Sequence, residues 1–317
     1  MEGPDRNQKI AIAGVLIAAV LFPLVGTNSY LVNVLVLMLV FILFASAWNF
    51  LAYSGQASLG HAAFFGLGGY GSVMIAKSLG FPALITIFGG GLLAAVIGVV
   101  IGLTCVRLRE WFLAMVTFGF AVIIQTLVVS SFAPVTGGWD GLSAPRLIPG
   151  GPSGLLLEYY VILLITALGI LALFLILRSR VGLAFAAIRE NEMEARAAGV
   201  DPVKYKLFAF AISTFLAGVA GALEIHHFGY ITPEIFGAEV SFWPVIYSIF
   251  GGLGTITGPI LGTFLLTFFW DGLKGMGLTY ERFIIIGGLL ILVVIFLPRG
   301  LVSLPERIRD VVHRKKN

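Results

Sequence analysis

The chain has 317 residues, of which 59% are hydrophobic and only 11% are charged, and its formal net charge is +4. Soluble domains carry about 25% charged residues, so this composition excludes an ordinary soluble protein. Several apolar runs approach the ~20 residues that a helix needs to cross a bilayer. We therefore predict an all-α polytopic integral membrane protein, with a single transmembrane domain over residues 1–317.

In chain order, the apolar runs predict spans at about 10–26, 30–50, 60–76, 82–106, 111–132, 155–177 and 207–228. A long stretch without charges, 240–270, and a last run at 283–297 follow. Gly251, Gly252, Gly254 and Pro259 interrupt the long stretch, because glycine and proline break helices. We expect two short helices there, about 241–251 and 258–270, which gives about ten segments, eight full and two short.

The basic residues orient these spans, because Lys and Arg are enriched in cytoplasmic loops. With a cytoplasmic N-terminus, 16 of the 20 Lys and Arg residues lie inside, including those of the basic tail 298–317. The same rule explains the net positive charge without a nucleic-acid partner. To keep the tail inside, 240–270 must either cross twice or form a re-entrant hairpin, and the sequence leaves both open.

A dense charged segment, 178–206, separates two apolar spans and contains ten charged residues. Each charge would cost roughly 2.5–3.5 kcal/mol at the centre of a membrane helix, so we place this loop in the cytoplasm. The composition of 183–198 favours one short helix. Gly199 is suited to end that helix, and Asp201 with Pro202 is suited to begin the next.

The short helix has two faces when it is drawn as one continuous helix. One face is a stripe of mostly small residues, Ala184, Ile188, Asn191, Ala195 and Ala198. Arg189, Glu192 and Arg196 lie opposite, and Glu192 can pair with Arg196 one turn later. The pattern fits either a solvated helix packed on its own spans or a helix that docks on a partner, and we expect the charged face to meet such a partner.

Several functions lack their sequence signals. The patterns GxxxxGK[ST], GxSxG and HExxH are absent, so the chain is predicted to have neither a P-loop ATP site nor these catalytic sites. Few ionisable residues lie within the spans, which argues against an ion-coupled porter. We expect no metal and no cofactor. Glu224, His226 and His227 cluster near a helix end, where a wetted end with a local ion pair is favoured over a metal site.

Three stretches resemble the membrane permease subunits of Liv-type ABC importers, which import branched-chain amino acids. They are AWNFLAYSGQASLGHAAFFGLGGYG (47–71), SRVGLAFAAIRENEMEARAAGVDPVKYKLFAFAISTFLAGVAGAL (179–223) and FGGLGTITGPILGTFLL (250–266). The SLGHAAFFG wording resembles the M-type permease rather than its H-type sister. The resemblance implies an ABC importer permease fold in a bacterial or archaeal cytoplasmic membrane, with both termini in the cytoplasm. Relatives also carry urea, short amides or other amino acids, and a self-sufficient channel or porter is the alternative of a different class.

The resemblance also implies partners and a coupling site. The partners are an H-type permease, two ATP-binding subunits that hydrolyse ATP, and a substrate-binding protein at the outer face. The coupling helix would lie near 187–199, although its E-A-R-A-A-G wording departs from the EAA-x3-G of many ABC importers. The interface candidates are Arg189, Glu190, Asn191, Glu192, Glu194, Arg196 and Gly199.

Two interrupted segments are candidates for the translocation path, because paired breaks in apolar segments mark such paths in transporters. The candidates are Gln56, Ser58, His61, Gly251, Gly252 and Gly254. For Gln56, Ser58 and His61, internal hydrogen bonding is the alternative. For Gly66, Gly68, Gly69 and Gly71, close helix packing is favoured, because small residues let membrane helices approach.

Overall fold

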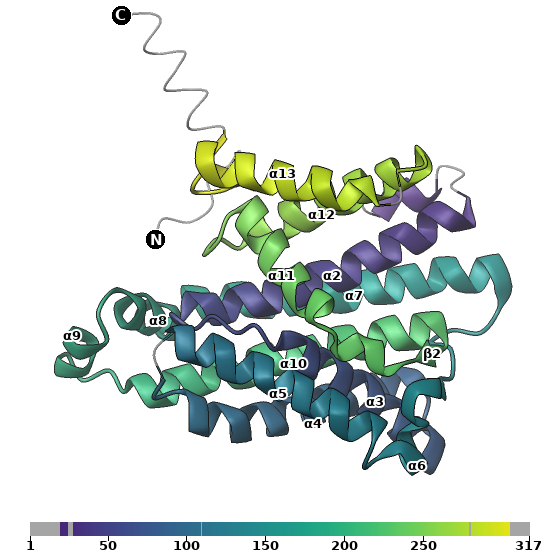
Figure 1. Ribbon diagram of the computed structural model, residues 1–317, viewed down its shortest axis with the longest axis horizontal. Helices are drawn as coiled ribbons and strands as arrows, with labels where there is room; N and C mark the ends of the chain where they lie inside the picture. Colours follow the sequence, from purple (N-terminus) through teal and green to yellow (C-terminus); the bar gives the residue numbers. More distant parts are fainter. Residues whose placement is uncertain (1–19, 25–27, 109, 279, 305–317) are drawn as a thin grey trace, which may run out of the picture.

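The computed structural model describes residues 20–24, 28–108, 110–278 and 280–304, so the predicted span 10–26 and most of the basic tail lie largely outside the described residues (Figure 1). Nine predicted spans appear as helices. They are α2 (Ser29–Tyr53), α3 (His61–Leu79), α4 (Ala83–Cys105), α5 (Glu110–Val129), α7 (Gly151–Arg178), α10 (Pro202–Phe228), α11 (Ala238–Gly251), α12 (Thr257–Gly275) and α13 (Glu281–Phe296).

Five helices within the described ranges are long and apolar enough to cross a membrane. They are the segments Ser29–Tyr53, Ala83–Cys105, Trp111–Val129, Ser153–Arg178 and Pro202–Phe228. The other predicted spans form shorter or less apolar helices, α3 and α12 with 19 residues, α13 with 16 and α11 with 14. The class of an all-α polytopic membrane protein is therefore confirmed.

Helix α10 lies at the centre of the larger helical layer, where it packs against α2, α3 and α4. Glycines allow these backbones to approach very closely. A Cβ added to Gly68 on α3 would collide with the backbone of Gly218 on α10, and one added to Gly90 on α4 would collide with the carbonyl of Gly68. The packing role expected for Gly68 is confirmed, and added Cβ atoms at Gly66, Gly69 and Gly71 would also meet close neighbours.

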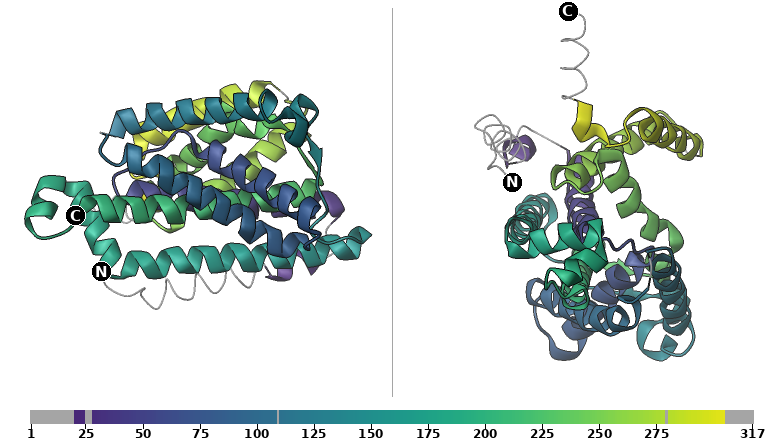
Figure 2. Two further views of the ribbon diagram at one scale, coloured as in Figure 1. Left: turned by 90° about the horizontal axis from the view of Figure 1, so that it is seen from below. Right: turned by 90° about the vertical axis from the view of Figure 1, so that its left-hand side faces the viewer.

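Helices α11, α12 and α13 form a second layer on the other side of α2 (Figures 1 and 2). Its core includes Ala45 of α2 together with Tyr247 and Leu266. Aromatic rings join the layer internally, with Trp243 5.4 Å from Tyr247 and 5.1 Å from Trp270 between ring centroids. Helix α2 is therefore shared by both layers.

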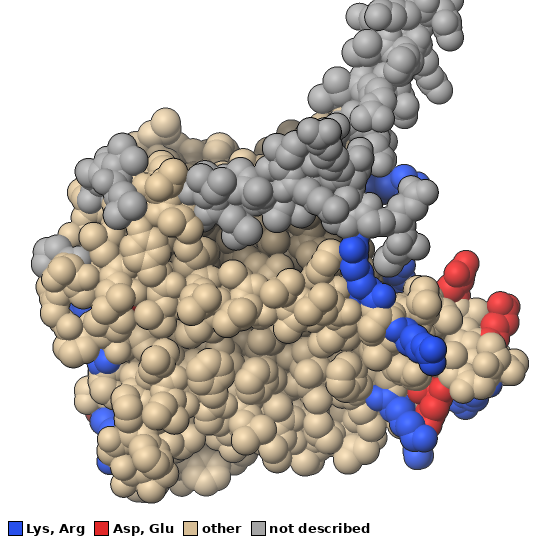
Figure 3. Space-filling model, turned by 180° about the vertical axis from the view of Figure 1, so that it is seen from behind, with Lys and Arg blue, Asp and Glu red and all other residues tan. Residues whose placement is uncertain are grey.

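The two ends of the molecule differ in structure and charge. One end carries α8 (Arg180–Glu190) and α9 (Glu192–Ala197), and charged side chains gather there, so we name it the charged end (Figure 3). The opposite end holds the short elements α6 (Ala133–Thr136), η2 (Gly138–Asp140) and η3 (Pro233–Phe236). There β1 (Leu142–Ser143) pairs with β2 (Tyr230–Ile231) as an antiparallel sheet, with Leu142 opposite Ile231. Two further turns of 3-10 helix are η1 (Phe22–Leu24) and η4 (Leu301–Ser303).

Candidate functional site

The charged loop contains two helices where the sequence predicted one. Helix α8 ends at Glu190, Asn191 is extended with φ −156° and ψ 110°, and α9 begins at Glu192. The Asn191 carboxamide explains the break, because its Oδ1 accepts the amide N–H groups of Met193 and Glu194. This N-cap competes with helix continuation and prevails. The single continuous helix is therefore wrong, and of the predicted stripe the structure buries Ala184, Ile188 and Ala195 but exposes Asn191 and Ala198.

The turn after α9 forms as predicted. Gly199 has φ +86°, in the left-handed region where glycine is favoured. The Val200 amide donates to the Ala195 carbonyl and the Gly199 amide to the Arg196 carbonyl, which is the Schellman pattern. Asp201 then caps α10 by accepting from the Val203 and Lys204 amides. Burial acts to raise the pKa of Asp201, but its hydrogen bonds and its ion pair with Lys204 lower that pKa below its ordinary value.

The two faces of the loop differ in exposure. Ala184, Ile188 and Ala195 are buried against the rest of the chain. The charged interface candidates Arg189, Glu190, Glu194 and Arg196 are exposed, as are Asn191 and Gly199. The side chain of Met193, between them on α9, is 82% exposed. The face available to another molecule is therefore the charged one, with the apolar side chain of Met193 among the charges.

Glu192 is the residue that ties α9 to the membrane helices. Its Oε1 lies 3.1 Å from Nη2 of Arg196, which confirms the predicted i,i+4 pair. Its Oε2 lies 2.5 Å from Nζ of Lys206, whose side chain is only 10% exposed. The sequence did not indicate this second pair. The Lys206 carbonyl in turn accepts from Nε2 of Gln56 at 3.0 Å. Gln56 lies in the first break, the turn between α2 and α3. Hydrogen bonds and an ion pair therefore connect α9, the base of α10 and this turn.

Arg189 connects the charged loop to both interrupted segments, the first break between α2 and α3 and the second break between α11 and α12. Its backbone lies beside Gly55, where an added Cβ would be 3.4 Å from the Arg189 Cα. Its guanidinium reaches the second break, where a Cβ on Gly254 would be 3.0 Å from Nη1. The same guanidinium lies 5.8 Å from the ring of Tyr53 at the end of α2. The two breaks, about 200 residues apart in the sequence, thus meet at one side chain of the loop.

The first break is a buried polar turn between α2 and α3. The Ser58 carbonyl accepts from Nε1 of Trp48 at 2.6 Å, and its hydroxyl accepts from the Gly60 amide. His61 is fully buried, with Nε2 2.8 Å from the hydroxyl of Ser213. For Ser58 and His61 the geometry favours the internal hydrogen bonding left open by the sequence. Two buried atoms of this break, Oε1 of Gln56 and Nδ1 of His61, have no hydrogen-bond partner among the described residues.

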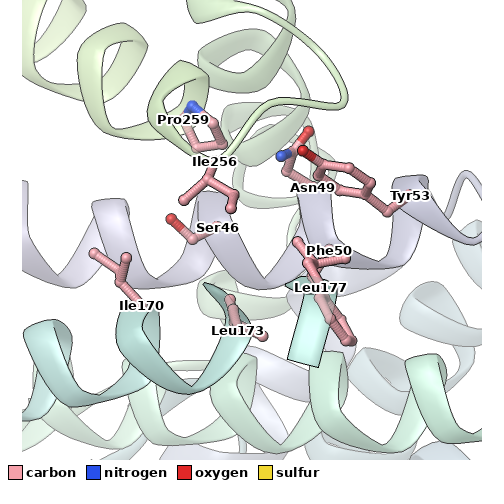
Figure 4. Close-up of a pocket in the computed structure, with 9 residues that line it drawn as sticks. All are labelled: Ser46, Asn49, Phe50, Tyr53, Ile170, Leu173, Leu177, Ile256 and Pro259. Carbon is pink, nitrogen blue, oxygen red and sulfur yellow. The ribbon is translucent and has the colours of Figure 1, made fainter. Parts of the chain in front are cut away.

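The second break lies at the charged end and is held by α2. Asn49 donates from Nδ2 to the Thr255 carbonyl at 2.7 Å and accepts from the Gly254 amide at 2.9 Å. Gly251 packs closely, because an added Cβ would collide with the Gly258 carbonyl. Gly252 has φ +140° and an added Cβ would lie 3.0 Å from the Arg299 carbonyl. The pocket between this turn, α2 and α7 measures about 10 Å³, room for about one water molecule (Figure 4).

The cluster at the opposite end of α10 is not a wetted helix end. His226 and His227 are buried, and Nδ1 of His227 lies 3.0 Å from Oε1 of Glu158 on α7 rather than near Glu224. His226 contacts the Ser72 hydroxyl and the Pro145 carbonyl. Glu224 is partly exposed. No group of three or more His, Cys, Asp or Glu able to hold a metal occurs in the described part of the chain.

Comparison with known proteins identifies the family. Residues 30–295 match the family model described as "Branched-chain amino acid transport system / permease component". The high-affinity branched-chain amino acid transport system permease protein LivM of Escherichia coli K12 is 29% identical, covering 96% of this chain and 77% of that protein. A probable LivM of Methanocaldococcus jannaschii is 25% identical, with 68% and 67% covered. LivH of Escherichia coli K12 is 26% identical, with 80% and 87% covered.

No solved structure matches the chain significantly. The family match covers most of the sequence and includes all three stretches that carry the resemblance, with the charged loop among them. The chain belongs to the permease family of branched-chain amino acid transport systems.

Proposed function

We propose that the chain is the M-type permease subunit of an ATP-driven importer for branched-chain or other small amino acids. The observation that carries this proposal is the Glu192–Lys206 pair. It fixes an exposed charged helix to the base of α10, the central helix of the larger layer. An importer subunit without an ATP site of its own needs such a connection, because its conformational change must be driven by a partner that binds one conformation better than another.

A displacement that the ATPase imposes on the exposed face of α9 would be transmitted to the membrane helices by two routes. One route runs from Glu192 through Lys206 to α10 and Gln56. The other runs from Arg189 to the turn at Gly254, which Asn49 fastens to α2. Closure of two ATP-hydrolysing subunits would thereby shift both layers of helices between outward-open and inward-open arrangements. The two breaks, with Gln56, Ser58, His61, Gly251, Gly252 and Gly254, are our candidates for the translocation path.

The proposed topology has ten segments in an ABC importer permease fold, with both termini cytoplasmic in a bacterial or archaeal inner membrane. The charged loop 178–206 and the tail 298–317 then lie on the cytoplasmic side. A sister H-type permease completes the path, and a binding protein delivers the substrate from outside. The relatives named LivM and LivH support this pairing.

Reconstitution tests the proposal. The chain is placed in liposomes with its sister permease and ATPase subunits, and uptake of radiolabelled L-leucine is followed with external binding protein and internal ATP. Glu190→Lys is the informative variant, because Glu190 is exposed and has no hydrogen bond or ion pair among the described residues. Lys77→Glu is the matched charge reversal at the opposite end, where Nζ of Lys77 donates to the Ser143 hydroxyl at 3.2 Å.

We expect Glu190→Lys to lower uptake at least tenfold and to weaken copurification of the ATPase, with Lys77→Glu close to the native chain. ATP-dependent uptake of urea or a short amide in place of leucine would show that the importer works as proposed but carries a different substrate. Leucine flux in liposomes that contain this chain alone would overturn the proposal in favour of a self-sufficient channel or porter.

A further inference from the structure

Four helices enclose a space between the two layers of the molecule, which we name the interlayer space. Helices α2 and α3 each pack against both α10 and α11. By contrast, α10 and α11 make little direct contact with each other, and the same is true of α2 and α3. Helices α10 and α11 belong to different layers (Figure 1). Side chains rather than backbones therefore meet in the interlayer space.

Aromatic side chains from three of the four helices meet there. The ring centroid of Phe41 on α2 lies 6.4 Å from that of Phe65 on α3 and 6.0 Å from that of Tyr247 on α11. Trp243, one turn before Tyr247, stacks on it at 5.4 Å. Phe65 and Tyr247 are buried, but Phe41 and Trp243 are partly exposed. This aromatic cluster therefore presents part of its surface to an opening.

The fourth helix contributes Glu224. Ser213 of α10 donates to the Ala47 carbonyl of α2 at 2.6 Å, which sets the level at which these antiparallel helices meet. At 1.5 Å per residue, Glu224 lies roughly 7 Å farther from the charged end than Phe41. Side chains on a helix tilt toward its N-terminus, so Glu224 points back toward the aromatic cluster. Its charge acts on the Tyr247 hydroxyl, which agrees with this placement.

Glu224 is an unpaired carboxylate in an accessible position. Protein surrounds it densely, and no hydrogen bond or opposite charge among the described residues acts on it. The neighbouring histidines of α10 have other partners, Glu158 for His227 and Ser72 for His226. Glu224 is nevertheless partly exposed, so it lines a crevice. Ionisable residues in such positions within membrane spans typically belong to substrate or ion pathways.

We propose that Glu224 and the aromatic cluster bind the ammonium group of the transported amino acid in the interlayer space. The inference rests on the proposed function for its cargo, and it adds the group that recognises one end of that cargo. An ammonium group only donates hydrogen bonds and a carboxylate only accepts them. The faces of Phe41 and Trp243 attract the same cation electrostatically. The two partly exposed aromatic rings and the carboxylate therefore suit one cationic head group.

This assignment separates the candidate substrates. Urea and short amides are neutral, so an unpaired carboxylate beside aromatic rings offers them no ionic contact. An α-amino acid carries a protonated amino group at neutral pH. The contact is made with the amino group and not with the substrate side chain. We therefore expect the permease to favour amino acids over neutral amides while it accepts several different apolar side chains.

Binding to the assembled importer tests the assignment. The permease pair with its ATPase subunits is placed in phosphatidylcholine nanodiscs without binding protein, and ligands are titrated by calorimetry. The ligands are L-leucine, isoamylamine, which lacks the carboxylate, and 4-methylpentanoate, which lacks the ammonium group. We expect leucine and isoamylamine to bind saturably and 4-methylpentanoate to bind at least tenfold more weakly than leucine.

Variants assign the ammonium contact to Glu224. Glu224→Gln keeps the shape and removes the charge, and we expect it to weaken leucine and isoamylamine binding at least tenfold while 4-methylpentanoate binding stays unchanged. Glu224→Asp keeps the charge and should restore part of the affinity. Glu239→Gln is the matched control with native binding expected, because Glu239 is an exposed glutamate in the first turn of α11. Thermal unfolding checks that each variant is folded.

Three results overturn the inference. They are absence of saturable leucine binding to the native importer, 4-methylpentanoate binding as tight as that of leucine, and equal leucine binding by Glu224→Gln and the native importer. If Glu224→Gln lowers uptake but binds leucine like the native importer, the carboxylate serves a proton or the conformational change, and the inference is again wrong.

The same preparations keep the two proposals apart. If ATP-driven leucine uptake occurs while leucine binding does not depend on Glu224, the inference alone fails. If leucine binding depends on Glu224 but no ATP-driven uptake follows in the reconstituted importer, the proposed function alone fails.

Discussion

Nζ of Lys206 lies 2.5 Å from Oε2 of Glu192, and the lysine side chain is buried while the glutamate is partly exposed. The pair joins the second short helix of the charged loop to the first turns of α10. A lysine amino group in a largely buried position needs a counter-charge, and Glu192 supplies it. The pair therefore joins α9 to the central helix α10 through one electrostatic contact.

Removal of this contact should uncouple and destabilise the protein. Lys206→Met keeps a similar length but leaves Glu192 with Arg196 as its partner, and we expect a loss of about 1.5–3 kcal/mol in stability, the range for a hydrogen bond to a charged group. Lys204→Met is the control, since its pair with Asp201 is exposed and worth less than about 1 kcal/mol. Thermal unfolding in detergent and the ratio of ATP hydrolysed to leucine transported measure both effects. Equal behaviour of the two variants would contradict the role of Lys206.

The cap at Asn191 should matter for coupling more than for folding. Asn191→Ala removes the acceptor of the Met193 and Glu194 amides, which costs about 1 kcal/mol locally. We expect faster amide exchange in α9 and reduced leucine uptake. Asn28→Ala removes a comparable N-cap from α2 at the opposite end, where Asn28 accepts from the Leu31 amide. If Asn28→Ala lowers uptake as much as Asn191→Ala, the cap has no special connection with coupling.

The contact of three helix backbones should tolerate no added methyl group. Gly218→Ala would place a Cβ against Ala94 and the backbone of Gly91, and we expect a loss of about 1–3 kcal/mol or failure to assemble. Gly272→Ala is the control, because nothing lies within 4 Å of its added Cβ. Yield of folded protein and thermal unfolding distinguish the two. A native-like Gly218→Ala protein would show that these helices are less tightly packed than the structure indicates.

The buried contact between α7 and α10 gives a paired test on two glutamates. Glu158→Gln weakens the hydrogen bond to His227, and since both side chains are at most 5% exposed we expect a cost of about 1–3 kcal/mol. Glu224→Gln should cost less than Glu158→Gln, because Glu224 has no hydrogen bond or ion pair among the described residues and its replacement leaves no partner unpaired. A larger effect of Glu224→Gln than of Glu158→Gln would contradict this assignment. Thermal unfolding of the two variants decides it.

Local signals in the sequence were sufficient for much of the structure. Apolar runs predicted nine helices that the structure contains, because the length and apolar character of each run depend only on the residues within it. Gly199, Asp201 and Pro202 predicted the turn before α10 for the same reason, since a left-handed glycine and an N-cap act over a few residues. The Glu192–Arg196 pair was predictable from helical spacing alone.

Contacts between distant segments were not predictable from these signals. Asn49 and Thr255 are separated by 206 residues and His227 and Glu158 by 69 residues, so no periodicity relates them. The break at Asn191 was missed for a different reason. The helix propensity of the surrounding residues favoured one continuous helix, whereas Asn191 as an N-cap favoured a break. The prediction followed the propensity.

The glycine contacts among α3, α4 and α10 have a mechanical consequence. Backbones that touch at Gly68, Gly90 and Gly218 cannot slide past one another, because carbonyl groups of one helix occupy the only space available to the next. We therefore expect α3, α4 and α10 to move together as one rigid unit when the Lys206 end of α10 is displaced. A displacement at Glu192 should then move the far end of α10 as well, where His226 contacts the Pro145 carbonyl and both His226 and His227 are buried.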